Sequence, residues 1–174
     1  MILADPGLQR IGNTALPQRL PRLRVLEGFI KTARRAAGLR GEVNVLLTTD
    51  AHQRALNKKF RGKAKTTDVL SFPALPDAGY AGDLSISLPV ARRQAEEHGH
   101  ALMTELKILI LHGVLHLAGY DHETDGGEMA ALEETLRAKL KLPAGLIGRA
   151  TRRRSTPKSP TPPGRRRSGA VLGR

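Results

Sequence analysis

Residues 102–122 read LMTELKILILHGVLHLAGYDH. Within 102–118, aliphatic residues cover nearly the whole circumference of a helix: Leu106, Ile108, Leu109, Ile110, Leu111, Val114, Leu115 and Leu117. A helix that is apolar all round lies at the centre of a domain, because each of its faces needs another element to cover it. We therefore predict a central buried helix around which the rest of the chain packs.

Two histidines interrupt this helix, and a third follows it. His112 and His116 are spaced i, i+4, so both imidazoles lie on one helical face, one turn apart. Gly119 supplies the positive φ that commonly ends a helix, and His122 follows in the loop. Three imidazoles with one open position form a catalytic zinc site, where the pKa of a bound water falls to about 7. We expect one Zn²⁺ per chain; a chance cluster of packed core histidines is the alternative.

The same spacing matches the histidine and glycine positions of the metzincin peptidase motif, HExxHxxGxxH. Gly113 stands where those peptidases carry their general-base glutamate. A zinc metallopeptidase-like hydrolase is therefore a weaker alternative. Met129 could imitate a Met-turn, but its helical spacing favours the core. The other histidines, His52, His98 and His100, are expected on the surface or in loops without a function.

The remaining periodicities predict an α+β fold. Helices are expected over 23–39, 51–59, 90–98 and 128–142, and strands over 43–49, 68–72 and 82–88. Asp50 is the expected N-cap of the second helix, and Pro89 suits the first turn of the third. Two of the strands are joined by a short turn, which favours a single domain with a small mixed β-sheet packed by helices.

Basic charge is concentrated at the end of the chain. The 174 residues carry a formal net charge of +13, and residues 149–174 hold nine Lys and Arg and no acid. That segment is also rich in proline, so we expect a disordered basic tail that either binds RNA phosphates or only aids solubility. Residues 1–22 are expected to form an N-terminal extension, and 23–148 the folded domain.

Several classes of protein and site are excluded by composition. There are no cysteines, so disulfide partners and thiolate metal sites are ruled out. No apolar run reaches the ~18 residues of a membrane span. Residues 1–21 lack the apolar stretch of a signal peptide. We expect a cytoplasmic protein without a membrane partner.

Four motifs together resemble the YbeY family of bacterial metal-dependent endoribonucleases, the rRNA maturation factors. They are HGVLHLAGYDH, TDVLSFP (67–73), GDLSIS (82–87) and the loop around Arg61, within about residues 20–142. The resemblance implies Zn²⁺ held by His112, His116 and His122, and cleavage of single-stranded RNA. It further implies a role in 3′-end maturation of small-subunit (16S) rRNA and in ribosome quality control, with single-stranded rRNA and ribosomal particles as partners.

Other residues complete the expected site. The resemblance implies a functional arginine that maps to Arg61, which could clamp a phosphate and stabilise charge during its transfer, beside His112 as a catalytic ligand. Lys63 and Lys65 are expected to attract RNA. Asp83 and Asp121 are candidates to orient a ligand histidine, although Asp83 could simply cap a turn. A non-catalytic ribosome assembly factor with a structural zinc is the other alternative.

Overall fold

The computed structural model describes residues 1–10, 23–75, 79–122 and 124–144. The predicted tail, 149–174, and most of the predicted N-terminal extension lie outside them. The described elements are β1 (Ile2–Ala4), a 3-10 turn η1 (Pro6–Arg10), α1 (Leu23–Ala36), β2 (Glu42–Thr48), α2 (Asp50–Arg61), β3 (Val69–Pro73), β4 (Tyr80–Ser87), α3 (Leu88–His98), α4 (Leu102–Leu117) and α5 (Glu128–Lys139).

The strands form one mixed sheet in the order β1-β2-β4-β3. β1 and β2 pair in parallel, β2 and β4 pair in parallel, and β3 and β4 form an antiparallel hairpin. The register places Val45 beside Leu84, and Ser71 beside Leu84 on its other side. This mixed sheet with helices confirms the α+β class expected from the sequence.

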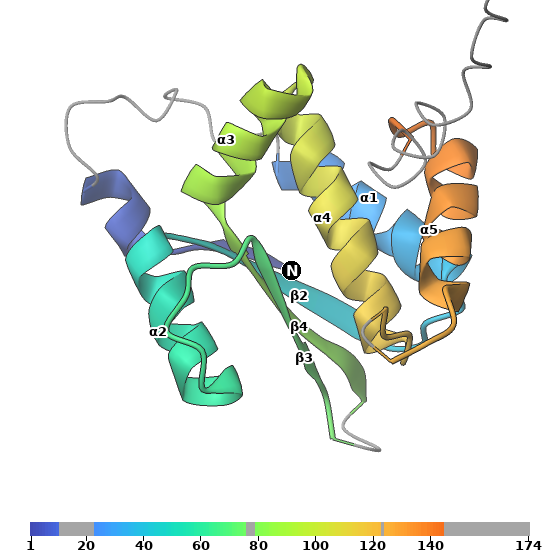
Figure 1. Ribbon diagram of the computed structural model, residues 1–174, viewed down its shortest axis with the longest axis horizontal. Helices are drawn as coiled ribbons and strands as arrows, with labels where there is room; N and C mark the ends of the chain where they lie inside the picture. The colour runs from blue at the N-terminus through green and yellow to red at the C-terminus, as the bar shows by residue number, and fades with distance from the viewer. Residues whose placement is uncertain (11–22, 76–78, 123, 145–174) are drawn as a thin grey trace, which may run out of the picture.

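Helix α4 is the centre of the molecule, as its apolar circumference predicts. Figure 1 shows it running across the sheet, with α1, α3 and α5 around it. Leu106, Ile110 and Val114 of α4 belong to the core cluster shared with the sheet. Leu111 and Leu115 belong to a second cluster, which α1 and α5 complete. Two apolar clusters on different faces of one helix account for its burial on nearly every side.

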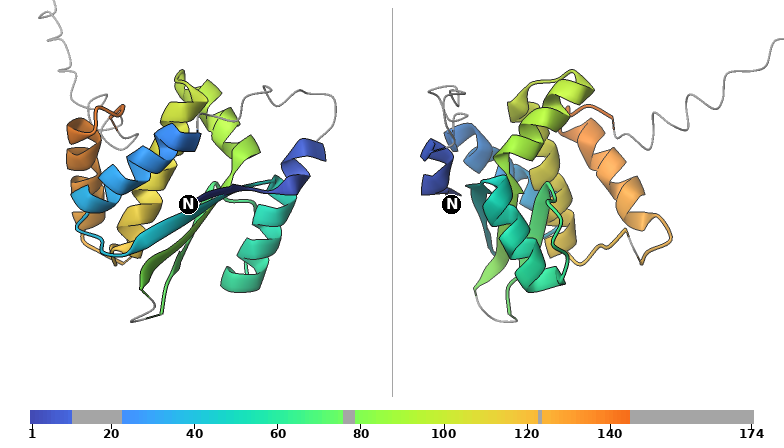
Figure 2. Two further views of the ribbon diagram at one scale, coloured as in Figure 1. Left: turned by 180° about the vertical axis from the view of Figure 1, so that it is seen from behind. Right: turned by 60° about the vertical axis from the view of Figure 1, so that its left-hand side comes forward.

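Helix α2 covers the opposite face of the sheet, as Figures 1 and 2 both show. Its link to the sheet is polar: buried Gln53 donates to the Ser85 carbonyl at 3.0 Å and accepts from the Ser85 hydroxyl at 2.7 Å. Ser85 faces α2 while its neighbour Leu84 faces α4, because successive strand side chains alternate between faces. Phe60 of α2 meets Phe72 of β3 on this same face.

The observed boundaries differ from the predicted ones by a few residues. Thr49, not Asp50, is the N-cap of α2, since its hydroxyl accepts from the His52 backbone N–H at 3.2 Å. The predicted helix over 128–142 ends at Lys139. Met129 is 1% exposed and belongs to the second core cluster, which confirms its expected place in the core. Gly119 has a φ of 93° directly after α4, as its position predicted.

Strand β1 was not expected, because three residues are too few to show an alternating pattern. Figure 2 shows it along the edge of the sheet beside β2. Asp5 fastens its end: the carboxylate accepts from the Gly7 N–H at 2.7 Å and from Thr48 Oγ1 at 2.7 Å, and lies 2.6 Å from His52 Nδ1. Hydrogen bonds from His52, Thr48 and Gly7 lower the pKa of Asp5 to about 2.

Among the described residues, no single helix is long and apolar enough to cross a membrane. α3 and α4 reach the required length and hydropathy only as a pair, and they are bent by 113° at their junction.

Asp5→Asn should destabilise the protein by about 1–2 kcal/mol at pH 7, since a charged acceptor of several hydrogen bonds is lost. Because the folded pKa of Asp5 lies below its ordinary value of 3.8, the ionised carboxylate stabilises the fold above pH ~4. This contribution disappears as pH falls toward 2. Urea unfolding at stepped pH should show the wild-type and variant curves converging there. An unchanged gap would contradict the role of Asp5, and Glu97→Gln, an exposed acid, is the control.

At Gly113, α4 lies close against the sheet. A Cβ built there would lie 2.7 Å from Leu84 Cδ2 and 3.3 Å from Ser71 Oγ. The Ser71 hydroxyl also donates to the Gly113 carbonyl at 3.3 Å. Position 113 therefore faces the sheet, and a carboxylate there would be packed between α4 and β4. This geometry explains why a glycine replaces the peptidase glutamate.

Gly113→Ala should lower the free energy of unfolding by about 1–3 kcal/mol, because the added methyl overpacks the contact with buried Leu84. Gly28→Ala is the matched control: Gly28 also lies in a helix, and nothing lies within 4 Å of its added Cβ. That control should stabilise the protein by about 0.5–1 kcal/mol. Denaturant unfolding of both variants measures the difference, and equal effects would refute the close contact.

Candidate metal centre and adjoining cavity

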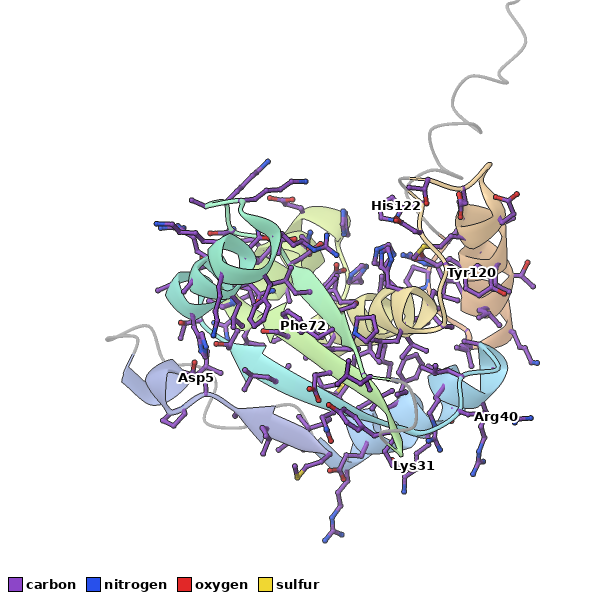
Figure 3. The ribbon with its side chains drawn as sticks, turned by 90° about the horizontal axis from the view of Figure 1, so that it is seen from below. Asp5, Lys31, Arg40, Phe72, Tyr120 and His122 are labelled. Carbon is purple, nitrogen blue, oxygen red and sulfur yellow. The ribbon has the colours of Figure 1, made fainter. Side chains whose placement is uncertain are left out.

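The three predicted histidines meet at one point. His112 and His116 lie on successive turns of α4, and His122 follows the turn at Gly119. One ring nitrogen from each lies within 4.8 Å of the others. Nε2 of His112 and Nε2 of His116 are 3.1 Å apart. Figure 3 shows His122 on the loop that follows α4, beside α5. The loop thus closes the cluster that the helix begins.

An acidic residue from α5 orients His112. Glu133 Oε2 lies 2.9 Å from Nδ1 of His112, so this nitrogen is engaged and Nε2 is left to face the other imidazoles. Arg137, one turn further along α5, donates from Nε to Glu133 Oε1 at 2.9 Å. A carboxylate behind an imidazole is the usual arrangement for a metal-binding histidine, because it fixes the ring and raises its basicity.

Electrostatics favour the ligand forms of these groups. Burial lowers the pKa of His116, and the charges of His112 and His122 lower it further. A lowered pKa keeps the imidazole neutral, which is the form that binds a metal. Burial raises the pKa of Glu133, but the hydrogen bond to His112 and the charges of His112 and Arg137 outweigh it, so the net shift is downward.

The cluster suits a divalent metal ion. On a tetrahedral zinc ion with bonds of about 2.0–2.1 Å, neighbouring nitrogens are about 3.4 Å apart, close to the 3.1 Å between the two Nε2 atoms. Imidazole nitrogen is a preferred zinc ligand, and three protein ligands match a catalytic site. His122 is an exposed residue of the loop that follows α4. His112 and His122 both line a cavity of about 700 Å³.

A basic groove adjoins this cavity. The groove, of about 370 Å³, is lined by Arg61, Lys63 and Lys65, and Asp68 and Gln94 line both the groove and the cavity. The two hollows therefore share a wall. Arg61 ends α2, and Gly62, with a φ of 69°, turns the chain into the loop that carries both lysines. The structure thus places three cations next to the histidine cavity.

Hydrogen bonds hold the basic loop in place. Asn57 of α2 donates to the Lys65 carbonyl at 2.6 Å, and Arg54 donates to the Thr66 hydroxyl at 3.2 Å. Asp68 then accepts from the Val69 N–H at 2.8 Å and from Gln94 Nε2 at 3.0 Å. The second half of the loop is therefore held in place, while the side chains of Lys63 and Lys65 remain exposed.

Of the two aspartates predicted as candidates to orient a histidine, only Asp121 lies near the histidine cluster. Asp121 lies near His116 and raises its pKa, although other effects outweigh it. Asp83 is not brought to the histidines: it accepts from Asn44 Nδ2 at 3.0 Å and, next to Leu84, faces away from α4. Glu133, whose carboxylate contacts the His112 ring, was not predicted from the sequence. Only the docking of α5 brings it there, and no short motif signals that contact.

Two of the histidines expected on the surface or in loops are only partly exposed. The side chains of His98 and His100 are 22% and 14% exposed and lie against Glu105 of α4. Glu105 pairs with these two histidines, which lie at the end of α3 and in the following turn. His52 pairs with Asp5 instead.

The family model described as Endoribonuclease YbeY matches residues 21–141. The chain is 60% identical over 124 residues to an Endoribonuclease YbeY of Koribacter versatilis, covering 71% of this chain and 81% of the relative. It is 45% identical over 123 residues to the one of Aquifex aeolicus, covering 68% and 82%. The solution structure of TM1509 from Thermotoga maritima matches with a TM-score of 0.50 at 27% identity, over 85% of this chain and 96% of that one.

Glu133→Gln should weaken zinc binding by about 10–100-fold, because the neutral amide supports the His112 imidazole less well. Competition with a chelating dye measures the affinity of the full chain. Glu128→Gln, an exposed acid at the start of the same helix, should bind zinc like the wild type. Equal affinities for all three proteins would show that Glu133 has no part in holding the metal.

Proposed function

The chain belongs to the YbeY family of endoribonucleases, hydrolases that act on RNA, and we propose that it is a Zn²⁺-dependent enzyme specific for single-stranded RNA. Its proposed task is 3′-end maturation of small-subunit (16S) rRNA and ribosome quality control, on ribosomal particles in the cytoplasm. One observation carries the proposal: two members of the three-histidine cluster, His112 and His122, line a cavity whose wall continues into the groove of Arg61, Lys63 and Lys65.

The charge distribution supports an RNA substrate. Three cations in the groove can neutralise successive phosphates and hold the strand while one phosphodiester reaches the histidines. The cavity has the size of a small-molecule pocket, so it suits nucleotides of an unpaired strand better than a rigid duplex. The described part of the chain has few aromatic side chains near these hollows, which supports recognition through phosphates rather than through stacked bases.

Each residue of the site has a separate role in the proposed hydrolysis. His112, His116 and His122 would hold the ion, and Glu133 would keep the His112 ring in its ligand orientation. When bound, Zn²⁺ supplies Lewis acidity toward a phosphoryl oxygen and toward a coordinated water. Arg61 would clamp a phosphate and stabilise the negative charge that develops during the transfer. Asp68 and Gln94, between the two hollows, lie where the strand would pass.

The geometry favours this function over the other two candidates. A peptidase would need its carboxylate at position 113, which faces Leu84 rather than the cavity. A purely structural zinc would need a fourth protein ligand, whereas in the described residues the group consists of three histidines, two of which, His112 and His122, line a large cavity. The site is thus built to admit a substrate.

The proposal is tested by cleavage of single-stranded and duplex rRNA fragments. The wild type should cut only the single strand and lose activity with a chelator, and His116→Ala should show no cleavage because a ligand is lost. Arg61→Ala should retain its zinc but cleave about 10²-fold more slowly, the usual effect of removing one charge-stabilising group. A 2′,3′-cyclic phosphate on the product would identify the ribose 2′-OH as the nucleophile and exclude direct attack by water.

Arg40→Ala is the matched control for Arg61→Ala. Arg40 is an exposed arginine that lines neither hollow, and Figure 3 shows it with Lys31 on the side of the molecule formed by α1. It should cleave like the wild type. Circular dichroism would establish that each variant folds. Cleavage that survives the chelator, or equal rates for Arg61→Ala and Arg40→Ala, would contradict the proposal.

A further inference from the structure

A second group of metal-binding side chains lies in the same cavity. His98 ends α3, Gly99 turns the chain with a φ of 68°, and His100 follows in the turn. Glu105 stands in the first turn of α4. The 113° bend between the two helices brings these three side chains together. One ligand atom from each lies within 4.8 Å of the others.

The chemistry of Glu105 is what makes this cluster unusual. The residue is 3% exposed on a helix that is otherwise almost wholly apolar. Its described ion-pair partners are His98 and His100, and no lysine or arginine pairs with it in the part of the chain that the structure describes. A buried carboxylate that faces two imidazoles, which are neutral unless protonated, needs a positive charge beside it.

The second observation is an unsatisfied imidazole. Nδ1 of His100 is buried and has no hydrogen-bond partner among the described residues, while Nε2 lies against Glu105. Buried polar atoms are nearly always paired, with water or an ion where the protein supplies no partner. The described groups of the chain therefore leave Nδ1 of His100 without a partner, in a cluster whose three residues all line the cavity.

We propose that His98, His100 and Glu105 bind a second divalent transition-metal cation. Two imidazoles and one carboxylate form a donor set that suits Zn²⁺, Mn²⁺, Fe²⁺ or Co²⁺. His98 Nδ1 and Glu105 Oε2 are 3.6 Å apart, close to the ~3.4 Å between neighbouring ligands on a tetrahedral ion. The cation neutralises the buried carboxylate and joins the end of α3 to the start of α4.

This ion acts separately from the one at the three histidines. Glu105 and His112 are seven residues apart on α4, which corresponds to about 10 Å along the helix axis. Two ions that clamp one reacting phosphate stand only about 3.5–4 Å apart. The second cation therefore contacts a neighbouring phosphate of an RNA strand in the shared cavity, not the phosphate that is cleaved. This role in RNA binding rests on the proposed function, whereas the metal site itself does not.

The test is the number of cobalt ions bound by the full chain after it is stripped with a chelator. The wild type should bind two Co²⁺ per chain in equilibrium dialysis, and His116→Ala should keep one of them. Glu105→Gln should also keep one, at the three histidines, and the double variant should bind none. His98→Ala provides a second way to remove the site, because His98 lies at a helix end and is less buried than Glu105.

Glu96→Gln, an exposed acid of α3, is the control and should bind two ions. The proposal is overturned if the wild type binds only one ion and Glu105→Gln and His98→Ala leave that ion in place. It is equally overturned if a second ion binds but persists in both variants. If the wild type binds one ion that His116→Ala keeps and that Glu105→Gln and His98→Ala lose, the proposed function fails instead, so the two failures give different patterns.

Discussion

The structure depends on one constraint: α4 is buried on nearly every side and must still present two imidazoles, those of His112 and His116, on a single face. α4 needs the sheet on one face and α1 and α5 on others, and these contacts fix its rotation about its own axis. Once that rotation is fixed, His112 faces the cavity, His116 lies one turn further along the same face of α4, and Gly113 faces Leu84. The packing of the core therefore determines the direction in which the histidine side chains point.

The same packing accounts for the supporting residues. α5 docks through Met129 and Leu136 in the second core cluster, which brings Glu133 to Nδ1 of His112. α3 meets α4 at a sharp bend, which brings His98 and His100 to Glu105. Apolar contacts on one side of each helix thus place polar groups on the cavity side. The cavity is then bordered by nitrogen ligands, carboxylates and, across Asp68 and Gln94, a basic groove.

The sequence predicted the features that depend on residues close together in the chain. The apolar circumference of residues 102–118 predicted the central helix, and the i, i+4 spacing with Gly119 predicted the meeting of three histidines. The contacts of Glu133 and of Glu105 could not be predicted, because they join residues of different helices and depend on how those helices dock. β1 was missed since its three residues are held by pairing with β2 and by Asp5, not by any pattern of their own.

The central claim is that the three imidazoles share one ion whose remaining position opens to the cavity. A crystal structure of the zinc-loaded protein, with anomalous scattering recorded at the zinc edge, measures this directly. It should show an anomalous peak bonded to ring nitrogens of His112, His116 and His122 at about 2.0–2.1 Å, with no fourth protein ligand. A peak that touches only two of these rings, or a fourth side chain that completes the coordination, would contradict the account.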